Sequence, residues 1–218
     1  MNRRPRLLTT AAVGTTALLL LTACGGSDGD AKSNDKIAGV DTDESASTSA
    51  SASASAGAGR PEVSLPSDVV DKFESWQTGD DAKDAVLADT AKRIDATNDA
   101  ILRGDTGSAG LSFYYRDKAL SSAVEWVQAY VDANLSFTGT TRYYAPQVTL
   151  SGAESATVVY CADESKGFNK NRKTNKVDRT PSDESPYVLY NTRLEKTGQG
   201  VWQTTNLISK RGDKTCAG

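Results

Sequence analysis

Histidine is absent from the 218 residues, and its absence removes much of the chemistry that proteins use. Ser-His-Asp and Cys-His catalytic groups and His-ligated zinc or haem sites all require it. The three cysteines have no CxxC spacing, which argues against a zinc ribbon or a thioredoxin-type redox site. The formal charge of −3, from 25 basic and 28 acidic residues, is too near neutral for a protein that mainly binds nucleic acid. We therefore expect no metal, no cofactor and no nucleic-acid partner.

Tyrosine and aspartate are the groups that remain for acid-base chemistry. An aspartate base and tyrosine hydroxyl donors in an apolar pocket form one known type of catalytic site. The candidates of these two types are Tyr114, Tyr115, Asp117, Tyr130, Asp132, Tyr143, Tyr144 and Tyr160. Their spacing matches no catalytic signature, so we expect tyrosines that are half-buried in the core or a cavity wall, and solvated carboxylates.

Two charged stretches are further candidates. Asp95 and Asp99 lie one helical turn apart within an acidic stretch and could share a hard cation. The dense oxygen ligands and the glycine of a calcium loop are missing, so a solvated helix face is the preferred interpretation. Residues 166–179 hold six basic residues against one acidic residue. We expect them to form a mobile polar loop between two strands; the alternative is contact with anionic cell-wall polymer or lipid headgroups.

The N-terminus reads as an export signal. Three arginines among the first six residues precede an uncharged, leucine-rich stretch from Leu7 to Ala23, which is short for a membrane span but ordinary for a signal peptide. The following residues, Leu21-Thr22-Ala23-Cys24, resemble the lipobox of bacterial lipoproteins. The resemblance implies that the Cys24 thiol takes a diacylglyceryl group and becomes the mature N-terminus. The alternative is an uncleaved membrane anchor with an ordinary cysteine.

Export also bears on the other two cysteines. Outside the cytoplasm disulfides persist, so Cys161 and Cys216 are expected to form one. The bond would close a loop of roughly 56 residues and contribute about 4 kcal/mol of stability, less any strain. Two buried free thiols are the alternative.

Composition divides the chain into a signal peptide (residues 1–23), a lipidated cysteine with a tether (24–66) and one domain (67–218). Residues 45–59 read SASTSASASASAGAG and cannot bury enough apolar surface to fold. The tether is therefore expected to be disordered, with a reach of roughly 35 Å. All 3 tryptophans, 8 tyrosines and 4 phenylalanines lie in the domain.

Within the domain, the hydrophobic period changes halfway. Helical spacing predicts helices over residues 67–76, 80–102 and 116–133. Alternation predicts strands over residues 140–150, 155–162, 187–196 and 201–209, with a tight turn at Gly198 and Gly200 between the last two. The order predicts an α+β domain with N-terminal helices packed on one face of a curved antiparallel sheet.

These features together resemble the NTF2-like (cystatin-like, SnoaL-like) lipoproteins of high-GC Gram-positive bacteria. The telling residues are the run from Val158 to Ser165, the later strand with Trp202, and the final Cys216. In such proteins the two cysteines pair and fasten the chain end to the sheet. The fold hosts isomerase-like enzymes, binding proteins and inert adaptors, so it does not specify a function.

We therefore expect a lipoprotein on the outer face of the cytoplasmic membrane, held there through Cys24. Its domain is expected to be a non-enzymatic binding or envelope-associated accessory module, with an envelope protein or a small apolar ligand as partner. The alternative is an isomerase- or hydrolase-like enzyme that uses an interior Asp/Tyr pair.

Overall fold

The computed structural model describes residues 59–179 and 183–217. The predicted signal peptide, the lipidated Cys24 and the tether as far as residue 58 lie outside the described residues. None of the described helices combines the length and the apolar character that crossing a bilayer requires. Arg60 and Val63, which the sequence analysis placed in the tether, contact the domain, so its folded part extends to the N-terminal side of Ser67.

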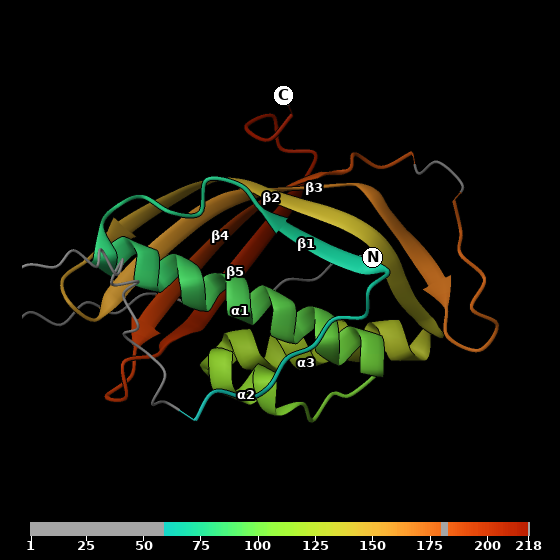
Figure 1. Ribbon diagram of the computed structural model, residues 1–218, viewed down its shortest axis with the longest axis horizontal. Helices are drawn as coiled ribbons and strands as arrows, with labels where there is room; N and C mark the ends of the chain where they lie inside the picture. Colours follow the sequence, from blue (N-terminus) through green and yellow to red (C-terminus); the bar gives the residue numbers. More distant parts are fainter. Residues whose placement is uncertain (1–58, 180–182, 218) are drawn as a thin grey trace, which may run out of the picture. The chain divides into compact units, whose positions relative to one another are not determined.

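A curved five-stranded sheet forms one layer of the domain (Figure 1). Its order follows the chain: β1 (Val69–Phe73), β2 (Leu135–Leu150), β3 (Ser155–Asn171), β4 (Tyr187–Lys196) and β5 (Trp202–Arg211). The last four strands are antiparallel, as predicted, whereas β1 pairs with β2 in parallel. In the first half of β3 the alternate residues Ala156, Val158, Tyr160 and Ala162 are buried on the concave face, as the alternation of side chains along a strand requires.

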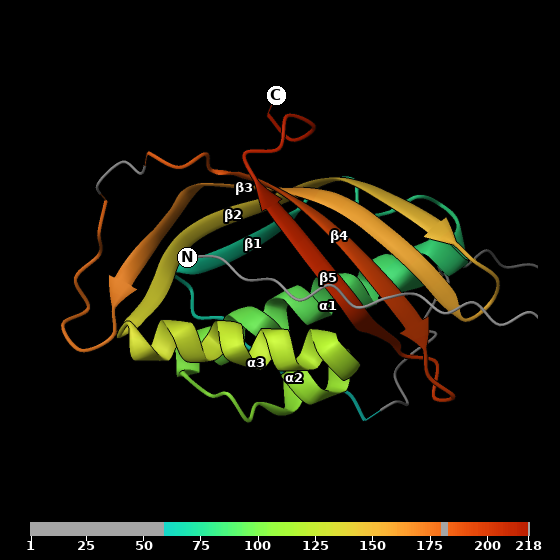
Figure 2. The ribbon, with the colours of Figure 1, turned by 180° about the vertical axis from the view of Figure 1, so that it is seen from behind.

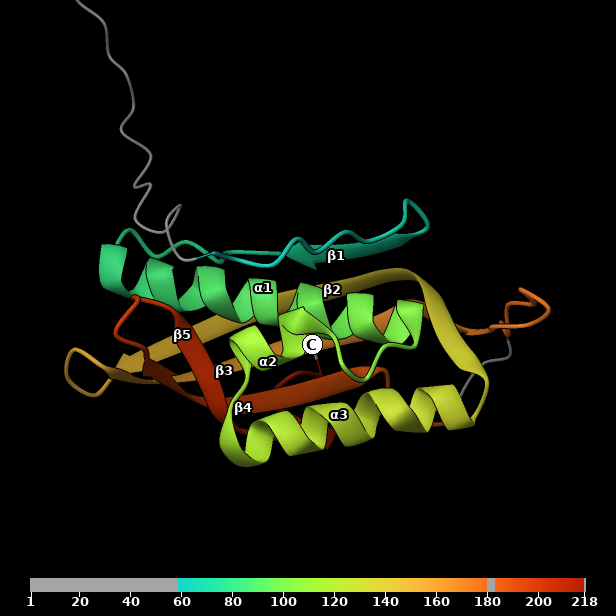
Figure 3. The same ribbon diagram turned by 90° about the horizontal axis from the view of Figure 1, so that it is seen from below.

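Three helices cover the concave face of this sheet: α1 (Asp81–Arg103), α2 (Ala109–Tyr114) and α3 (Asp117–Asp132). Seen from below, α1 and α3 run alongside each other with α2 between them (Figure 3), and the view from behind shows α3 beneath the sheet (Figure 2). The Asp80 side chain accepts hydrogen bonds from two backbone N–H groups at the start of α1. Gly104 ends the helix with a φ of 69°, a conformation that glycine adopts at low cost.

The α+β fold class and the four long strands are confirmed, but one predicted helix is wrong. Residues 67–76, expected to be helical from the spacing of Val70, Phe73 and Trp76, contain β1 instead. The stretch is too short to gain much from helix formation, whereas β1 pairs with β2 over its whole length and Phe73 stacks on Tyr143. Tertiary contacts therefore override the local pattern.

The basic stretch also departs from prediction, because much of it is not a loop. Residues 166–171 continue β3 and pair with β2. The Arg172 guanidinium then donates hydrogen bonds to the carbonyl oxygens of Ile101 and Leu102 at the end of α1. Part of the positive charge thus caps a helix C-terminus, where a cation is favourable.

The predicted disulfide is present in the structure. Cys161 in β3 is bonded to Cys216, and both are buried on the side of the sheet away from the helices. The Tyr144 hydroxyl donates a hydrogen bond to the carbonyl oxygen of Cys216. Together these links fasten the end of the chain to the convex face.

Candidate functional site: a buried guanidinium inside the domain

Arg93 lies at the middle of α1 and points into the space between the helix and the sheet. Only 4% of its surface is exposed. Its Nη2 donates a hydrogen bond of 2.7 Å to the Tyr160 hydroxyl on β3, and its Nη1 donates one of 3.3 Å to the Tyr115 hydroxyl after α2. The guanidinium carbon lies 5.5 Å from the centre of the Tyr115 ring and 6.0 Å from that of Tyr160. The charge is thus held between two aromatic faces.

Arg93 has no acidic partner among the described residues. None of the ion pairs within residues 59–179 and 183–217 includes it. The nearest carboxylate along the same helix face, Asp89, instead pairs with Arg60 at 2.5 Å and accepts a hydrogen bond from the Trp202 backbone N–H at 2.8 Å. A buried charge without a counter-charge costs several kcal/mol, so an unpaired interior arginine calls for an explanation.

The guanidinium is also not fully hydrogen-bonded. Its Nε is buried and has no partner within the described structure, and the same holds for the Thr204 hydroxyl on β5. Thr204 adjoins Tyr115, since its carbonyl oxygen accepts a hydrogen bond from the N–H of Arg116. Buried polar atoms are nearly always satisfied in folded proteins, and two of the five exceptions among the described residues belong to Arg93 and Thr204, which both contact Tyr115.

Burial holds Tyr160 and its neighbour Tyr190 in their neutral form. Burial alone would lower the pKa of Arg93, but the adjacent Tyr115 and Tyr160 more than reverse the effect and raise it. Burial raises the pKa of Tyr160, against the opposing effect of the guanidinium. Burial also raises the pKa of Tyr190, whose ring stacks on Tyr160 at 5.0 Å. Neutral hydroxyls can orient Arg93 but cannot compensate its charge.

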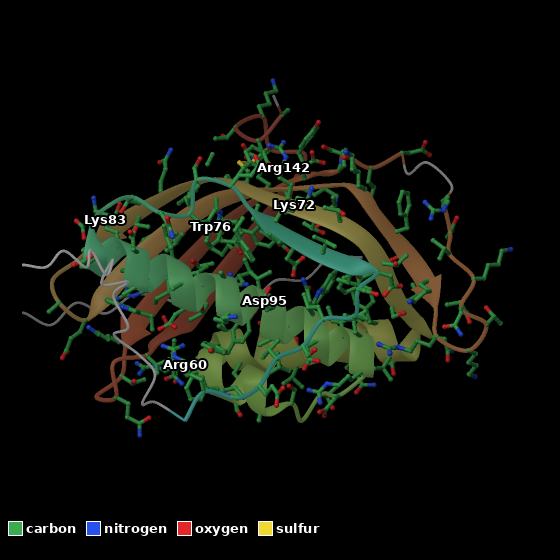
Figure 4. The ribbon with its side chains drawn as sticks, in the orientation of Figure 1. Arg60, Lys72, Trp76, Lys83, Asp95 and Arg142 are labelled. Carbon is green, nitrogen blue, oxygen red and sulfur yellow. A yellow bond between two sulfur atoms is a disulfide. The ribbon has the colours of Figure 1, made fainter. Side chains whose placement is uncertain are left out.

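A second unusual group lies between β1 and α1. The Asp71 carboxyl accepts a hydrogen bond of 2.7 Å from Asn98, while its other oxygen, Oδ1, is buried without a partner. Burial raises the pKa of Asp71 to about 7; the bond from Asn98 opposes this, and the neighbouring Asp95 carboxyl adds to it. Asp95 lies between α1 and β1 (Figure 4), and burial raises its pKa as well. Two carboxyl groups here share a site where both do not readily ionise.

The structure separates the acid-base candidates predicted from sequence. It brings Tyr115, Tyr143 and Tyr160 together inside the domain and leaves Asp117 exposed and Asp132 at the surface. The remaining tyrosines contact other groups: Tyr114 accepts a hydrogen bond from Arg60, Tyr130 packs on Phe137, and Tyr144 lies under the Arg142 guanidinium on the convex side (Figure 4).

The prediction that the acidic residues of α1 are solvated is wrong for two of them. Asp89 and Asp99 are 3% and 6% exposed, and each is paired with an arginine, Asp99 with Arg103 at 2.6 Å. Asp95 lies near Lys92 at 3.8 Å. Within the described residues, no three Cys, Asp or Glu side chains gather as metal ligands would.

Arg93 and Asp71, two unusual side chains of the interior, are not among the residues predicted from the sequence. Arg93 had a detectable signal, because it follows Val86 by seven residues and precedes Ile101 by eight. It therefore occupies the apolar stripe of the predicted helix, where a charged residue is out of place. Asp71 had no such signal, since its stretch was assigned to a helix.

Comparison with known proteins yields structural likeness alone. No protein-family model matches the sequence, and no characterised protein does so. Among solved structures, a ketosteroid isomerase-like protein from Erwinia carotovora atroseptica is 20% identical, with a TM-score of 0.36 over 57% of this chain and 93% of its own. A hexachlorocyclohexane dehydrochlorinase from Novosphingobium barchaimii is 12% identical, with a TM-score of 0.42 over 61% and 90%. An NTF2-like protein of unknown function in nutrient uptake from Rhodospirillum rubrum is 16% identical, with a TM-score of 0.38 over 57% and 97%.

Proposed function

We propose that this protein is a membrane-anchored extracellular lipoprotein whose NTF2-like domain binds a ligand inside its fold and performs no reaction on it. The observation that carries the binding role is Arg93, a buried cation that tyrosine hydroxyls orient and no described carboxylate neutralises. Such a group is costly to keep in a core that supplies no counter-charge and useful in a site that receives a partner.

The accessibility of the acidic groups favours binding over catalysis. A general base has to reach the proton that it removes, directly or through one water. Asp71 has a pKa near that of a useful base, but its free oxygen Oδ1 is out of contact with solvent between β1 and α1. The neighbouring Tyr143 is buried too, and burial raises its pKa well above the usual value. Asp71 and Tyr143 are therefore better suited to holding β1 against α1 than to catalysing a reaction.

The binding role is tested on the full chain released from the membrane of its own host in mild detergent. Native mass spectrometry of the intact protein, followed by denaturation and analysis of released small molecules, detects a ligand carried through purification. We expect a one-to-one complex that is lost on unfolding. A protein that carries no ligand, and that no candidate from an extract of the host envelope stabilises against heat, would contradict the binding role.

Lipid on Cys24 is the proposed anchor. Each buried methylene contributes about 0.8 kcal/mol, so two acyl chains are enough for stable attachment. Mass spectrometry of the mature N-terminal peptide should show Cys24 as the first residue, with a diacylglyceryl adduct. The Cys24→Ser variant should lose that adduct and its membrane association, while the Cys161→Ser variant keeps the adduct. An unmodified Cys24 within an intact N-terminal peptide would rule out the anchor.

A second candidate function is an isomerase- or hydrolase-like enzyme that uses Asp71 and Tyr143. The pKa of Asp71, about 7, is the observation that favours it, because a base is most useful near the working pH. This enzyme would show turnover that falls with Asp71→Asn and follows an ionisation near pH 7. The binding role predicts that ligand recovered from the protein is chemically unchanged after prolonged incubation with it.

A further inference from the structure

We propose that Arg93 anchors a small monocarboxylate in the interior of the domain, with the carboxylate seated on the Nε edge of the guanidinium. This inference rests on the proposed binding function and names the chemical class of its ligand. It follows from three features of the structure: the free donors of Arg93, the single positive charge of the site, and the side chains around it.

The donors of Arg93 are only partly used. A guanidinium has five N–H groups in one plane, and the two tyrosine hydroxyls occupy one on Nη2 and one on Nη1. The Nε–H has no partner within the described structure. Nε and Nη2 lie along the same edge of the guanidinium, and such an edge matches the two oxygens of a carboxylate. The unpartnered atom is thus where a bidentate anion would bind.

The tyrosines hold the Nε–Nη2 edge of the guanidinium in a fixed position. Tyr160 holds Nη2 from the sheet and Tyr115 holds Nη1 from the connection between α2 and α3. The Tyr115 hydroxyl is itself 2.9 Å from the Thr97 hydroxyl on the next turn of α1. Because two separate elements hold the guanidinium of α1, little side-chain freedom is lost when an anion binds.

The charge of the surroundings favours a monoanion. Arg93 supplies one positive charge, and the ionisable groups that contact it are the hydroxyls of Tyr115 and Tyr160. The field of Asp71 reaches Tyr143, whose ring centre lies 6.2 Å from that of Tyr160. A second negative charge on a ligand would therefore be buried without a partner. A carboxylate fits this balance, whereas a phosphate dianion does not.

The packed side chains beside Arg93 favour an apolar body on that carboxylate. Tyr160 belongs to the buried cluster that also contains Trp76, Ile94 and Val158, and the Tyr190 ring stacks on it. These side chains offer aromatic and aliphatic contacts and few further hydrogen bonds. Because Nε has no contact with solvent, the ligand enters only when interior side chains move, and its association is slower than that with an open site.

The experiment compares carboxylates with their neutral amides on the full mature chain in detergent, freed of any native ligand by unfolding and refolding with the disulfide intact. The probes are sodium benzoate with benzamide and sodium hexanoate with hexanamide, at constant ionic strength. Isothermal titration calorimetry gives affinity, and thermal unfolding gives stabilisation. We expect at least one acid to bind at least 10-fold more tightly than its amide.

Three variants locate the binding at Arg93. Arg93→Met should lower the affinity for the acid at least 10-fold and leave the weak affinity for the amide unchanged. Arg93→Lys keeps the charge but loses the planar edge. Its affinity for the acid should lie between that of the wild type and that of Arg93→Met. Arg142→Met removes a guanidinium on the convex side, paired with Glu74 and Asp163, and should bind as the wild type does.

The wild-type measurements alone can overturn the inference, even if Arg93→Met fails to fold. Equal affinity for each acid and its amide, or no binding of either acid, would contradict it, and so would full affinity in Arg93→Lys and Arg93→Met. If the protein from the host still carries a neutral ligand, the binding function stands and the carboxylate inference fails. If neither a native ligand nor any probe binds, both fail.

Discussion

The Nη2 atom of Arg93 lies 2.7 Å from the hydroxyl oxygen of Tyr160, and this hydrogen bond joins the middle of α1 to the concave face of β3. It is one of two bonds that fix a buried charge for which the described structure has no counter-charge. The bond therefore contributes to the fold and to the proposed site at once, and the two contributions can be measured separately.

Replacing Tyr160 by phenylalanine should destabilise the domain. The variant keeps the ring but leaves Nη2 of Arg93 without an acceptor in the core, at a cost of about 1–3 kcal/mol. Urea unfolding followed by tryptophan fluorescence measures the change. Tyr190→Phe is the matched control, because its ring stacks on Tyr160 and no hydrogen bond of its hydroxyl is described. We expect Tyr190→Phe to remain within about 0.5 kcal/mol of the wild type. Equal losses in both variants would contradict the role of the bond.

Stability should fall as the pH rises toward 7, because of Asp71. Its pKa is about 7 in the folded chain and about 3.9 when unfolded, so the folded state holds the proton more tightly between these values. The stabilising contribution is complete below about pH 4 and is lost as the pH rises through 7, by at most about 1.4 kcal/mol per pH unit. Urea unfolding between pH 4 and 8 measures the slope.

Asp71→Asn removes the titration and keeps a group that can pair with Asn98. Its stability should therefore change less with pH than that of the wild type over the same range. Asp117→Asn, at an exposed position, should retain the wild-type slope. A wild-type stability that increases steadily from pH 4 to 8, with no difference in Asp71→Asn, would show that Asp71 is ionised in the folded protein.

The bond between Cys161 and Cys216 should be a major source of stability. It closes a loop with a sequence separation of 55 residues, for which chain entropy predicts about 4 kcal/mol. The Cys161→Ser/Cys216→Ser double variant should lose about 2–5 kcal/mol in urea unfolding. Peptide mapping without reductant should recover the two cysteines in one linked peptide from the wild type. Free thiols at both positions would refute the pairing.

Gly139 should tolerate no side chain. Its φ is 104°, and a Cβ atom would overlap the carbonyl oxygen of Lys166 on the neighbouring strand. Gly139→Ala should therefore lower the free energy of unfolding by more than 2 kcal/mol, since both the backbone and β3 would have to shift. Gly198→Ala is the control, because it has open space around it and no positive φ. Similar stability of the two variants would contradict the close approach of β2 and β3.

Local patterns predicted the elements whose residues carry their own signal. The apolar spacing within α1 and α3, the alternation in β3 and the turn before β5 were enough to place them. The strand β1 was not predicted, because Val70, Phe73 and Trp76 have helical spacing and only pairing with β2 decides their conformation. The full length of β3 was not predicted for the same reason, since the residues from Lys166 onward are mostly polar and become a strand through their pairing with β2.

The site was less predictable than the fold, because it depends on contacts between distant residues. The sequence predicted Tyr115 and Tyr160 as candidates but not Arg93, which lies between them. Tyr160 is 67 positions from Arg93 in the sequence, and no local pattern brings the two together. Asp71 and Asn98 are 27 positions apart and meet only because β1 lies beside α1. Burial and pairing across the fold thus create the unusual groups, and they leave little trace in the spacing.

A crystal structure of the protein purified from its own host tests the central claim most directly. The account predicts density for a small molecule whose flat, two-oxygen end lies within hydrogen-bond distance of Arg93 Nε, with Tyr115 and Tyr160 still bound to the other nitrogens. A guanidinium paired with an acidic side chain of the chain itself, in an interior that holds no ligand, would contradict it.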